Sequence, residues 1–368
     1  MTRTLAFLAL FPLFCAAQDA GPTAPSFDQL SARAAEAFNA NRSAEAVDLF
    51  TQALKLKPSW PEGWWALGTL HYDANQYPEC RDDLTRLVAL DESAIAGWAL
   101  LGLCEFETKD FDASFQHLKR AHTMFPPGSS GQLLDVANYH LGLLLTRQGA
   151  FELSQEILVR VAEHVKDNPG MMFGCGLPAL RMAILPAEVP KDQKEAVFLA
   201  GKTFWDLTTR PPAQAEADFA TLLAKYPSFP SVHYFYGTYL AVHRPDTADA
   251  EFIQELHITP DSVPARVQLV LRYLLEQRIE EALKLAREAV ALSPDSVGTQ
   301  LALGRVLRER GDHDGALAAF LAAKRLDPVS PAVRPYLITE YRALGRMDDM
   351  RREQADYDLL KSAQKNWP

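Results

Sequence analysis

Two stretches of the sequence decide the fold: Trp64-Trp65-Ala66-Leu67-Gly68 and Trp98-Ala99-Leu100-Leu101-Gly102. They superimpose at a shift of 34 residues, with Trp64 over Trp98 and Gly68 over Gly102. The agreement continues downstream through an aromatic residue, a small residue and a leucine: Tyr77, Cys80 and Leu84 in the first copy, and Phe111, Ser114 and Leu118 in the second. A fixed period of this length is typical of a chain built from repeated structural units.

The same frame predicts nine units, with starts near residues 27, 61, 95, 135, 196, 230, 263, 297 and 331. Each unit opens with apolar residues at helical spacing, then breaks, then shows a second amphipathic stretch. The break often carries a residue that tolerates a left-handed turn: Asn41, Asn75, Gly149, Gly311 or Gly345. The second helix should end at a proline, because proline cannot continue a helix: Pro58, Pro126, Pro227, Pro260, Pro294 or Pro328.

Small residues recur where the two helices of a unit should come closest. In the first helix they are Ala34, Gly68, Gly102, Gly142, Gly237 and Gly304. In the second helix they are Ala46, Ser114, Ser154, Ala215, Ala282 and Ala316. Larger side chains at these places would push the pair apart.

With these features the sequence resembles the tetratricopeptide repeat family. One unit carries the family pattern as Trp98, Leu101-Gly102, Phe111, Phe115, Ala121 and Pro126, and another as Leu303-Gly304, Gly311, Ala316, Phe320, Ala323 and Pro328. The resemblance covers roughly residues 27 to 361, apart from one gap. It implies an all-α, helix-pair solenoid of the tetratricopeptide type, a right-handed superhelix of about nine units.

The expected organisation follows from where the period holds. Residues 18–26 form a flexible N-terminal segment, 27–168 an N-terminal repeat array, 196–346 a C-terminal array and 347–368 a capping helix and tail. Between 169 and 195 the period is lost, which indicates an irregular joint or a degenerate half-unit, with one apolar helix from Gly170 to Leu185. Glu353 is expected on the exposed, charged side of the capping helix, which a stacked array needs for solubility.

Residues 1–17 have the form of a cleavable secretory signal: Arg3, a short apolar run from Leu5 to Phe14, and small residues before Gln18. Cleavage near Ala17 would leave an exported chain, periplasmic or secreted. Lipid anchoring at Cys15 stays open as an alternative, although the bulky Phe14 before it disfavours that modification. No later stretch is long and apolar enough to span a membrane, so we expect no membrane span in the mature chain.

The charge balance and the missing motifs narrow the function. The chain has 37 Lys and Arg against 47 Asp and Glu, a formal net charge of −10, which argues against binding nucleic acid. Glycine-rich phosphate loops, nucleophile elbows and paired metal-binding histidines are absent from the sequence. We therefore expect no catalytic residue, no cofactor and no metal, and we interpret the nine histidines as solvated or packed side chains.

Three cysteines follow the predicted signal: Cys80, Cys104 and Cys175. Their spacing matches no zinc pattern. We expect three buried, reduced thiols. An exported chain permits a disulfide between Cys80 and Cys104, which stays open as a second possibility.

The family resemblance implies a concave groove, lined mainly by the first helix of each unit. Reading the family's groove-facing places in this sequence gives a candidate protein-binding set: Trp65, Thr69, Tyr72, Phe106, Tyr139, Arg147, Tyr234, Arg305 and Arg308. Large amphipathic rings are preferred interface anchors. The sequence thus predicts a scaffold, not an enzyme, that holds a peptide or a partner protein in this groove. The alternative is a structural subunit of an envelope-associated assembly that packs through its convex face.

Overall fold

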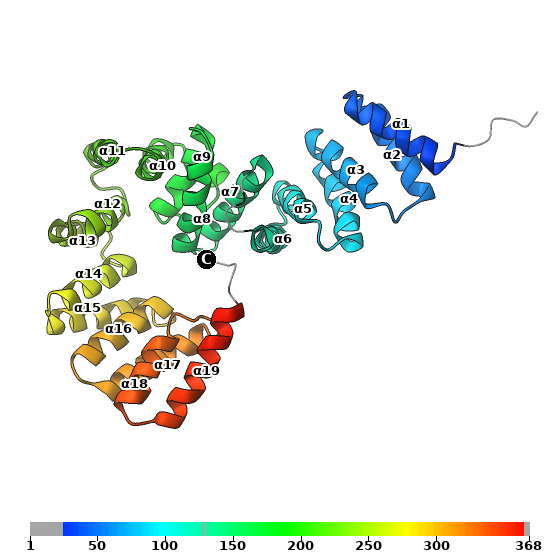
Figure 1. The fold of residues 1–368 in the computed structure, drawn as a ribbon. Coiled ribbons are helices and arrows are strands. Elements are labelled where there is room, and N and C mark those ends of the chain that lie inside the picture. The colour runs from blue at the N-terminus through cyan, green and yellow to red at the C-terminus, as the bar shows by residue number, and fades with distance from the viewer. Residues whose placement is uncertain (1–24, 127–128, 130, 364–368) are drawn as a thin grey trace, which may run out of the picture. The chain divides into compact units, whose positions relative to one another are not determined.

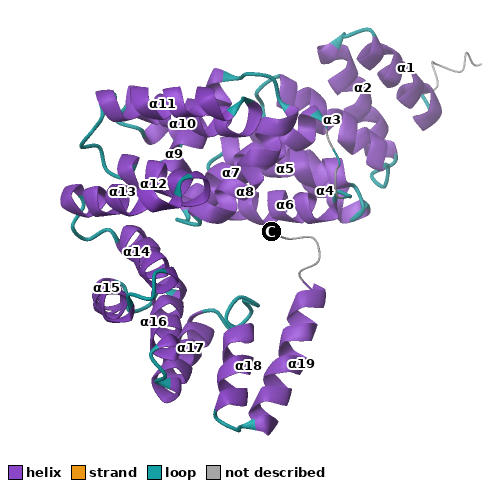
Figure 2. Cartoon of the chain, turned by 60° about the vertical axis from the view of Figure 1, so that its left-hand side comes forward, coloured by secondary structure: helices purple, strands orange, loops and turns teal. Residues whose placement is uncertain are grey.

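The structure, a computed structural model, describes residues 25–126, 129 and 131–363. The predicted signal, residues 1–17, lies outside the described residues. Every regular element in the described part is a helix, and no strand occurs there (Figure 2). The expected all-α class is therefore confirmed.

Nineteen α-helices and one short 3-10 helix make up the described chain. Their bounds are α1 Phe27–Asn39, α2 Ser43–Leu56, α3 Pro61–Asp73, α4 Tyr77–Leu90, α5 Ile95–Glu107, α6 Phe111–Met124, α7 Gln132–Arg147, α8 Phe151–His164, α9 Pro169–Ala179, η1 Pro186–Glu188, α10 Lys194–Thr209, α11 Pro212–Lys225, α12 Val232–His243, α13 Pro245–Ile258, α14 Val263–Leu275, α15 Ile279–Leu292, α16 Val297–Glu309, α17 His313–Leu326, α18 Arg334–Ala343 and α19 Met347–Ala363.

The chain divides into two compact units, and Figure 1 labels the helices of each. Unit 1 is Met1–Asp91 and contains α1 to α4, and unit 2 is Glu92–Pro368 and contains α5 to α19. In unit 1, α1 packs on α2 and α3 on α4. In unit 2, α5 packs on α6, α7 on α8 and α9 on α10; after α11, which also packs on α10, the pairing resumes with α12 on α13 and continues to α18 on α19. This is the helix-pair solenoid that the sequence predicts, and its helix number agrees with about nine units.

The turns inside the pairs follow the predicted chemistry. Left-handed backbone conformations occur at all five of the expected residues, with φ between 56° and 85°: Asn41, Asn75, Gly149, Gly311 and Gly345. The same conformation occurs at Lys109 and Gln277, where the sequence has neither Asn nor Gly. The packing of the helix pair therefore sets the turn geometry. Asn or Gly at the turn only lowers the free-energy cost of the left-handed backbone conformation.

The predicted prolines end the second helices. Each of the six lies two residues beyond the end of a helix; Pro58 follows α2 in this way, and Pro328 follows α17. The small residues also behave as expected. The six in the second helices, from Ala46 to Ala316, have no exposed surface at all. Ser114 Oγ even donates a hydrogen bond of 2.7 Å to the carbonyl of Gly102 on the partner helix.

Residues 169–195 contain α9 and η1, and α9 packs closely on α10. A Cβ atom at Gly176 would lie 1.9 Å from the carbonyl oxygen of Val197, and one at Gly201 would lie 1.7 Å from that of Met172. The two backbones therefore touch, and only glycine fits at both places. The helix ends at Ala179, earlier than the predicted Leu185, and Arg181 then adopts φ 53°.

Candidate functional site

In unit 1 the predicted groove residues form one stripe on α3. Trp65, Thr69 and Tyr72 are spaced by four and three residues, so they share a helix face, and all three are half-buried. The ring of Tyr72 packs edge-to-face on Tyr77 at 5.8 Å. Thr69 Oγ1 donates to the carbonyl of Ala66 at 2.9 Å. Of the two half-buried rings, that of Trp65 is the larger.

In unit 2 the structure brings Phe106 on α5 against His140 on α7, whose ring also contacts that of Tyr139. The rings of Phe106 and His140 lie 4.7 Å apart, and those of Tyr139 and His140 lie 5.5 Å apart, both edge-to-face. Phe106 also packs edge-to-face on Phe111 at 5.5 Å. The guanidinium of Arg147 lies 4.3 Å from the ring of Phe111. We call these five residues the aromatic patch: Phe106, Phe111, Tyr139, His140 and Arg147.

The aromatic patch is joined to the following segment. Tyr139 donates a hydrogen bond from its hydroxyl to the carbonyl of Gly170 at 3.1 Å, and Arg147 Nη1 lies 3.5 Å from Glu188 Oε1. Burial raises the pKa of the Tyr139 hydroxyl well above its usual range. Burial also lowers the pKa of His140, against the opposing effect of its hydrogen bond to the carbonyl of Val136. Both side chains therefore stay neutral at neutral pH.

The remaining predicted groove residues lie in different environments. Tyr234 is only 8% exposed and packs on Phe252, with the Arg181 guanidinium 5.2 Å from its ring. The structure thus places Tyr234 in the core, because Phe252 on the partner helix α13 and the Arg181 side chain lie against its ring. Arg305 and Arg308 are half-buried on α16.

Histidine–carboxylate pairs join helices in both units, and the interpretation of the histidines as solvated or packed does not predict them. His71 and Asp83 are 2.6 Å apart, Glu105 and His117 are 2.7 Å apart, and each pair spans 12 residues between the two helices of one unit. Three further pairs join His164 to Asp135, His233 to Glu251 and His313 to Glu340. A histidine and an acid 12 residues apart can meet across the two helices of one unit. This spacing is the sequence signal for the first two pairs.

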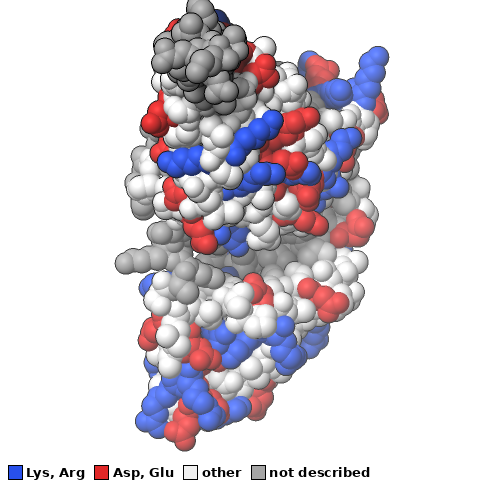
Figure 3. Space-filling model, turned by 90° about the vertical axis from the view of Figure 1, so that its right-hand side faces the viewer, with Lys and Arg blue, Asp and Glu red and all other residues white. Residues whose placement is uncertain are grey.

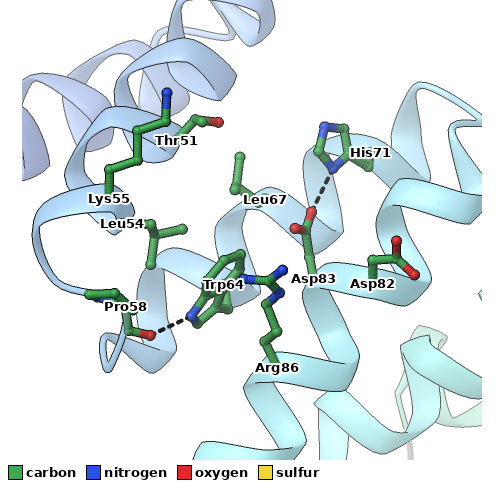
Figure 4. A pocket seen from close by; sticks show the side chains of 10 residues that line it. All are labelled: Thr51, Leu54, Lys55, Pro58, Trp64, Leu67, His71, Asp82, Asp83 and Arg86. Carbon is green, nitrogen blue, oxygen red and sulfur yellow. Dashed lines mark hydrogen bonds and ion pairs between the residues drawn. The ribbon is translucent and has the colours of Figure 1, made fainter.

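Unit 1 contains a cleft of about 350 Å³ between α2, α3 and α4 (Figure 4). Its lining residues are Thr51, Leu54, Lys55, Pro58, Trp64, Leu67, His71, Asp82, Asp83 and Arg86. The indole of Trp64 donates from Nε1 to the carbonyl of Pro58 at 2.8 Å, and the Arg86 guanidinium lies 4.8 Å from its ring. Burial raises the pKa of Asp83, although the hydrogen bond from His71 opposes that shift.

Two further kinds of feature, a metal site and a membrane-spanning helix, do not occur in the described residues. Three or more His, Cys, Asp or Glu side chains never converge in this part of the chain as a metal site would require. Over the same residues no helix combines the length and the apolar character needed to cross a bilayer. Basic and acidic side chains are interspersed on the face drawn in Figure 3.

The cysteines differ from the expectation of three reduced thiols. Cys80 and Cys104 are disulfide-bonded, and Cys175 is the free, buried cysteine of the described residues. Spacing along the chain could not reveal this, because a disulfide depends on the distance between Cα atoms in space. Burial raises the pKa of the Cys175 thiol far above its usual value, so this thiol is unreactive.

Solved structures with a similar arrangement of helices include a MamA RS-1 double mutant, which is 18% identical with a TM-score of 0.41 over 46% of this chain and 96% of that chain. MamA 41-end from Desulfovibrio magneticus RS-1 is 18% identical with a TM-score of 0.39 over the same shares. The Cut9–Hcn1 hetero-tetramer of APC/C is 16% identical with a TM-score of 0.33 over 91% of this chain and 73% of that chain.

No curated protein matches the sequence. The family described as Tetratricopeptide repeat matches at residues 31–89, 66–129 and 268–331. These ranges coincide with helix pairs of the predicted kind in both units. The chain therefore contains tetratricopeptide repeats over these residues, and its fold is one suited to protein–protein interaction.

Proposed function

We propose that the protein is an exported binding scaffold that holds a peptide or a partner protein on the first-helix face of its repeats. The observation that carries the proposal is the aromatic patch, where α5 and α7 present half-buried rings and the exposed Arg147 together. Half-buried rings can bury further area against a partner, and aromatic and arginine side chains dominate the binding energy of interfaces. Trp65 on α3 offers the same kind of anchor in unit 1.

Site-specific photo-crosslinking tests this face. A benzoyl-phenylalanine in place of Trp65 or Phe106, in the full chain, should crosslink a protein from an extract of the native host. Phe115 is the matched control, because it is a half-buried aromatic on the second helix α6. Crosslinks at Phe115 alone would contradict binding on the first-helix face.

A second candidate is a structural subunit of an envelope-associated assembly that packs through the second-helix face. The cleft of unit 1 favours it, since α2 and α4 are second helices and their residues Thr51, Lys55 and Arg86 line the cleft. A crosslinker at Thr51 separates the two candidates. Crosslinks at Thr51 without any at Trp65 and Phe106 would support the assembly subunit.

Export belongs to this proposal as well. It rests on residues 1–17, whose charged start, apolar run and small residues near Ala17 have the form of a secretory signal. The mature chain would then work in the periplasm or outside the cell.

A further inference from the structure

The cleft of unit 1 lies where its repeat differs from the following one in a histidine–carboxylate pair. In the following repeat the ring of His117 packs on the indole of Trp98, with 5.0 Å between the ring centres. A shift of 34 residues superimposes Asp83 on His117 and Trp64 on Trp98. The shorter Asp83 instead bonds to His71 on α3, at 2.6 Å. The space beside the Trp64 indole therefore stays open as the cleft of about 350 Å³.

Two cationic side chains line this cleft without an ion partner: Lys55 on α2 and Arg86 on α4. Both are exposed, and no carboxylate in the described part of the chain forms an ion pair with either of them. The guanidinium of Arg86 lies 4.8 Å from the Trp64 ring. A ring supplies no oxygen to accept hydrogen bonds from the guanidinium, so its N–H donors stay available.

The following repeat neutralises or omits the same two cations. There Glu92 takes the place of Pro58, and its carboxylate lies 3.0 Å from Arg120, the counterpart of the cleft arginine. Ala89 takes the place of the cleft lysine. Three differences therefore coincide in the first of the two repeats. One opens the cleft, one leaves its arginine unpaired and one adds a lysine.

The acidic side chains of the cleft, in contrast, already have partners. Asp83 is bonded to His71, and its side chain is only 12% exposed. Asp82 Oδ1 lies 3.2 Å from Nη2 of its neighbour Arg81. The unpaired charges that line the cleft are thus both positive, which favours an anion over a cation as its ligand.

The inner wall of the cleft is apolar. It is formed by Leu54 and Leu67, each 4% exposed, and by Trp64, which is 8% exposed. Figure 4 draws these three side chains between Lys55 on α2 and Arg86 on α4. Small-molecule sites combine apolar walls with a few polar groups and start at about 300 Å³. The cleft therefore has room for about one ring and its polar substituent.

We propose that this cleft binds a small organic anion with one aromatic or branched apolar group and one carboxylate. The apolar group would pack on Leu54 and Leu67, and the carboxylate would accept hydrogen bonds from Lys55 and Arg86. A guanidinium can donate two parallel hydrogen bonds to a carboxylate. The site is separate from the first-helix face, so the inference goes beyond the proposed function.

Isothermal titration calorimetry of the full chain with phenylacetate and with indole-3-acetate tests the proposal. The neutral amide of each acid is the reference ligand, because it keeps the ring and loses the charge. We expect at least one acid to bind at least about tenfold more tightly than its amide. This advantage should shrink between about 0.05 and 0.5 M salt, as screening predicts for exposed cations.

Single substitutions assign the two cations. Arg86→Gln and Lys55→Ala should each weaken binding of the acid by about fivefold or more and leave binding of the amide unchanged. Arg33→Gln is the matched control, because Arg33 is an exposed arginine on α1 of the same unit and does not line the cleft. It should leave the binding of both ligands unchanged.

A double variant closes the cleft without removing its cations. His71→Glu with Asp83→His copies the pair of the following repeat and should place an imidazole on the Trp64 indole. We expect this variant to lose both the acid and the amide while it keeps a melting temperature close to that of the parent. A folded double variant that binds the acid as tightly as the parent overturns the inference.

Three other outcomes also overturn it. One is that neither acid binds at about 10 mM, and another is that acids and amides bind equally well. The third is a peptide with a C-terminal phenylalanine that binds more tightly than phenylacetate and loses affinity in Arg86→Gln, which would reassign the cleft to a protein chain. Crosslinking at Trp65 or Phe106 would still support the proposed function in each case.

Discussion

Glu105 on α5 and His117 on α6 form a hydrogen-bonded pair, with 2.7 Å between Oε2 and Nδ1. In the preceding repeat, 34 residues earlier, the same two places hold His71 and Asp83 at 2.6 Å. The acid and the histidine have exchanged helices, yet the contact is kept. The repeat therefore selects a polar pair at this point of the helix interface, and either order satisfies it.

This exchange can be reproduced by mutation. His117→Leu should cost about 1–3 kcal/mol of unfolding free energy, because it leaves the carboxylate of Glu105, which is only 4% exposed as a residue, without its partner. The double variant Glu105→His with His117→Asp copies the earlier repeat and should recover much of that loss. Urea denaturation of the variants measures it; a double variant less stable than His117→Leu would contradict the equivalence of the two repeats.

Glycine at the helix contact gives a second prediction. A Cβ atom at Gly304 would lie 2.4 Å from Cε1 of Phe320, whereas one at Gly298 on the same helix meets nothing closer than 3.6 Å. Gly304→Ala should therefore cost about 1–3 kcal/mol by overpacking. Gly298→Ala should be neutral or stabilising by up to about 1 kcal/mol, through its higher helix propensity. Equal melting temperatures of the two variants would show that the contact relaxes freely.

The capping helix gives a third prediction and a correction. We expected Glu353 on an exposed face, but it is 4% exposed and bonds to Arg334 at 2.5 Å and to Lys324 at 2.6 Å. Glu353→Gln should cost about 3–5 kcal/mol, because it removes the buried charge partner of Arg334 and leaves only the exposed Asp356. Asp356 is the matched control; it lies 3.3 Å from the same arginine but its side chain is 57% exposed. Asp356→Asn should cost under about 1 kcal/mol, and a larger loss than for Glu353→Gln in thermal melts would contradict this account.

His140 gives a prediction for pH. Burial lowers its pKa in the folded state, so the unfolded chain takes up the proton more readily. The stabilising contribution of neutral His140 is thus complete above the usual value of 6.5 and is lost as the pH falls below it. His140→Gln should reduce the slope of stability against pH in this range by up to about 1.4 kcal/mol per pH unit. The parent protein in the same pH series of melts gives the reference slope, and an equal slope for the variant would contradict this account.

Export gives the last prediction. If Ala17 ends the signal, protein isolated from its native host will begin at Gln18. Intact-mass spectrometry reads this directly. A chain that retains Met1 would remove the export proposal, and a lipid mass on an N-terminal Cys15 would favour the alternative anchor.

The sequence by itself determined the repeat. Its period, turn residues and closing prolines are local features that return in each unit, and each acts within one helix pair. Residues such as Asn75 and Pro58 therefore predicted the turn and the helix end correctly. The small residues did the same for the helix contacts, because steric fit between two helices depends on a few side chains at fixed spacing.

Only the tertiary structure decided which side chains remain available to a partner. Tyr234 and Phe106 come from corresponding surfaces in the sequence pattern, yet Tyr234 is covered by the core while Phe106 keeps a half-buried ring. Glu353 is buried by its ion partners, whereas Arg86 has none among the described residues. Exposure and pairing are properties of the neighbouring helices as much as of the residue itself. The repeat pattern determines each helix pair, but it does not determine which side chains are exposed or which are paired.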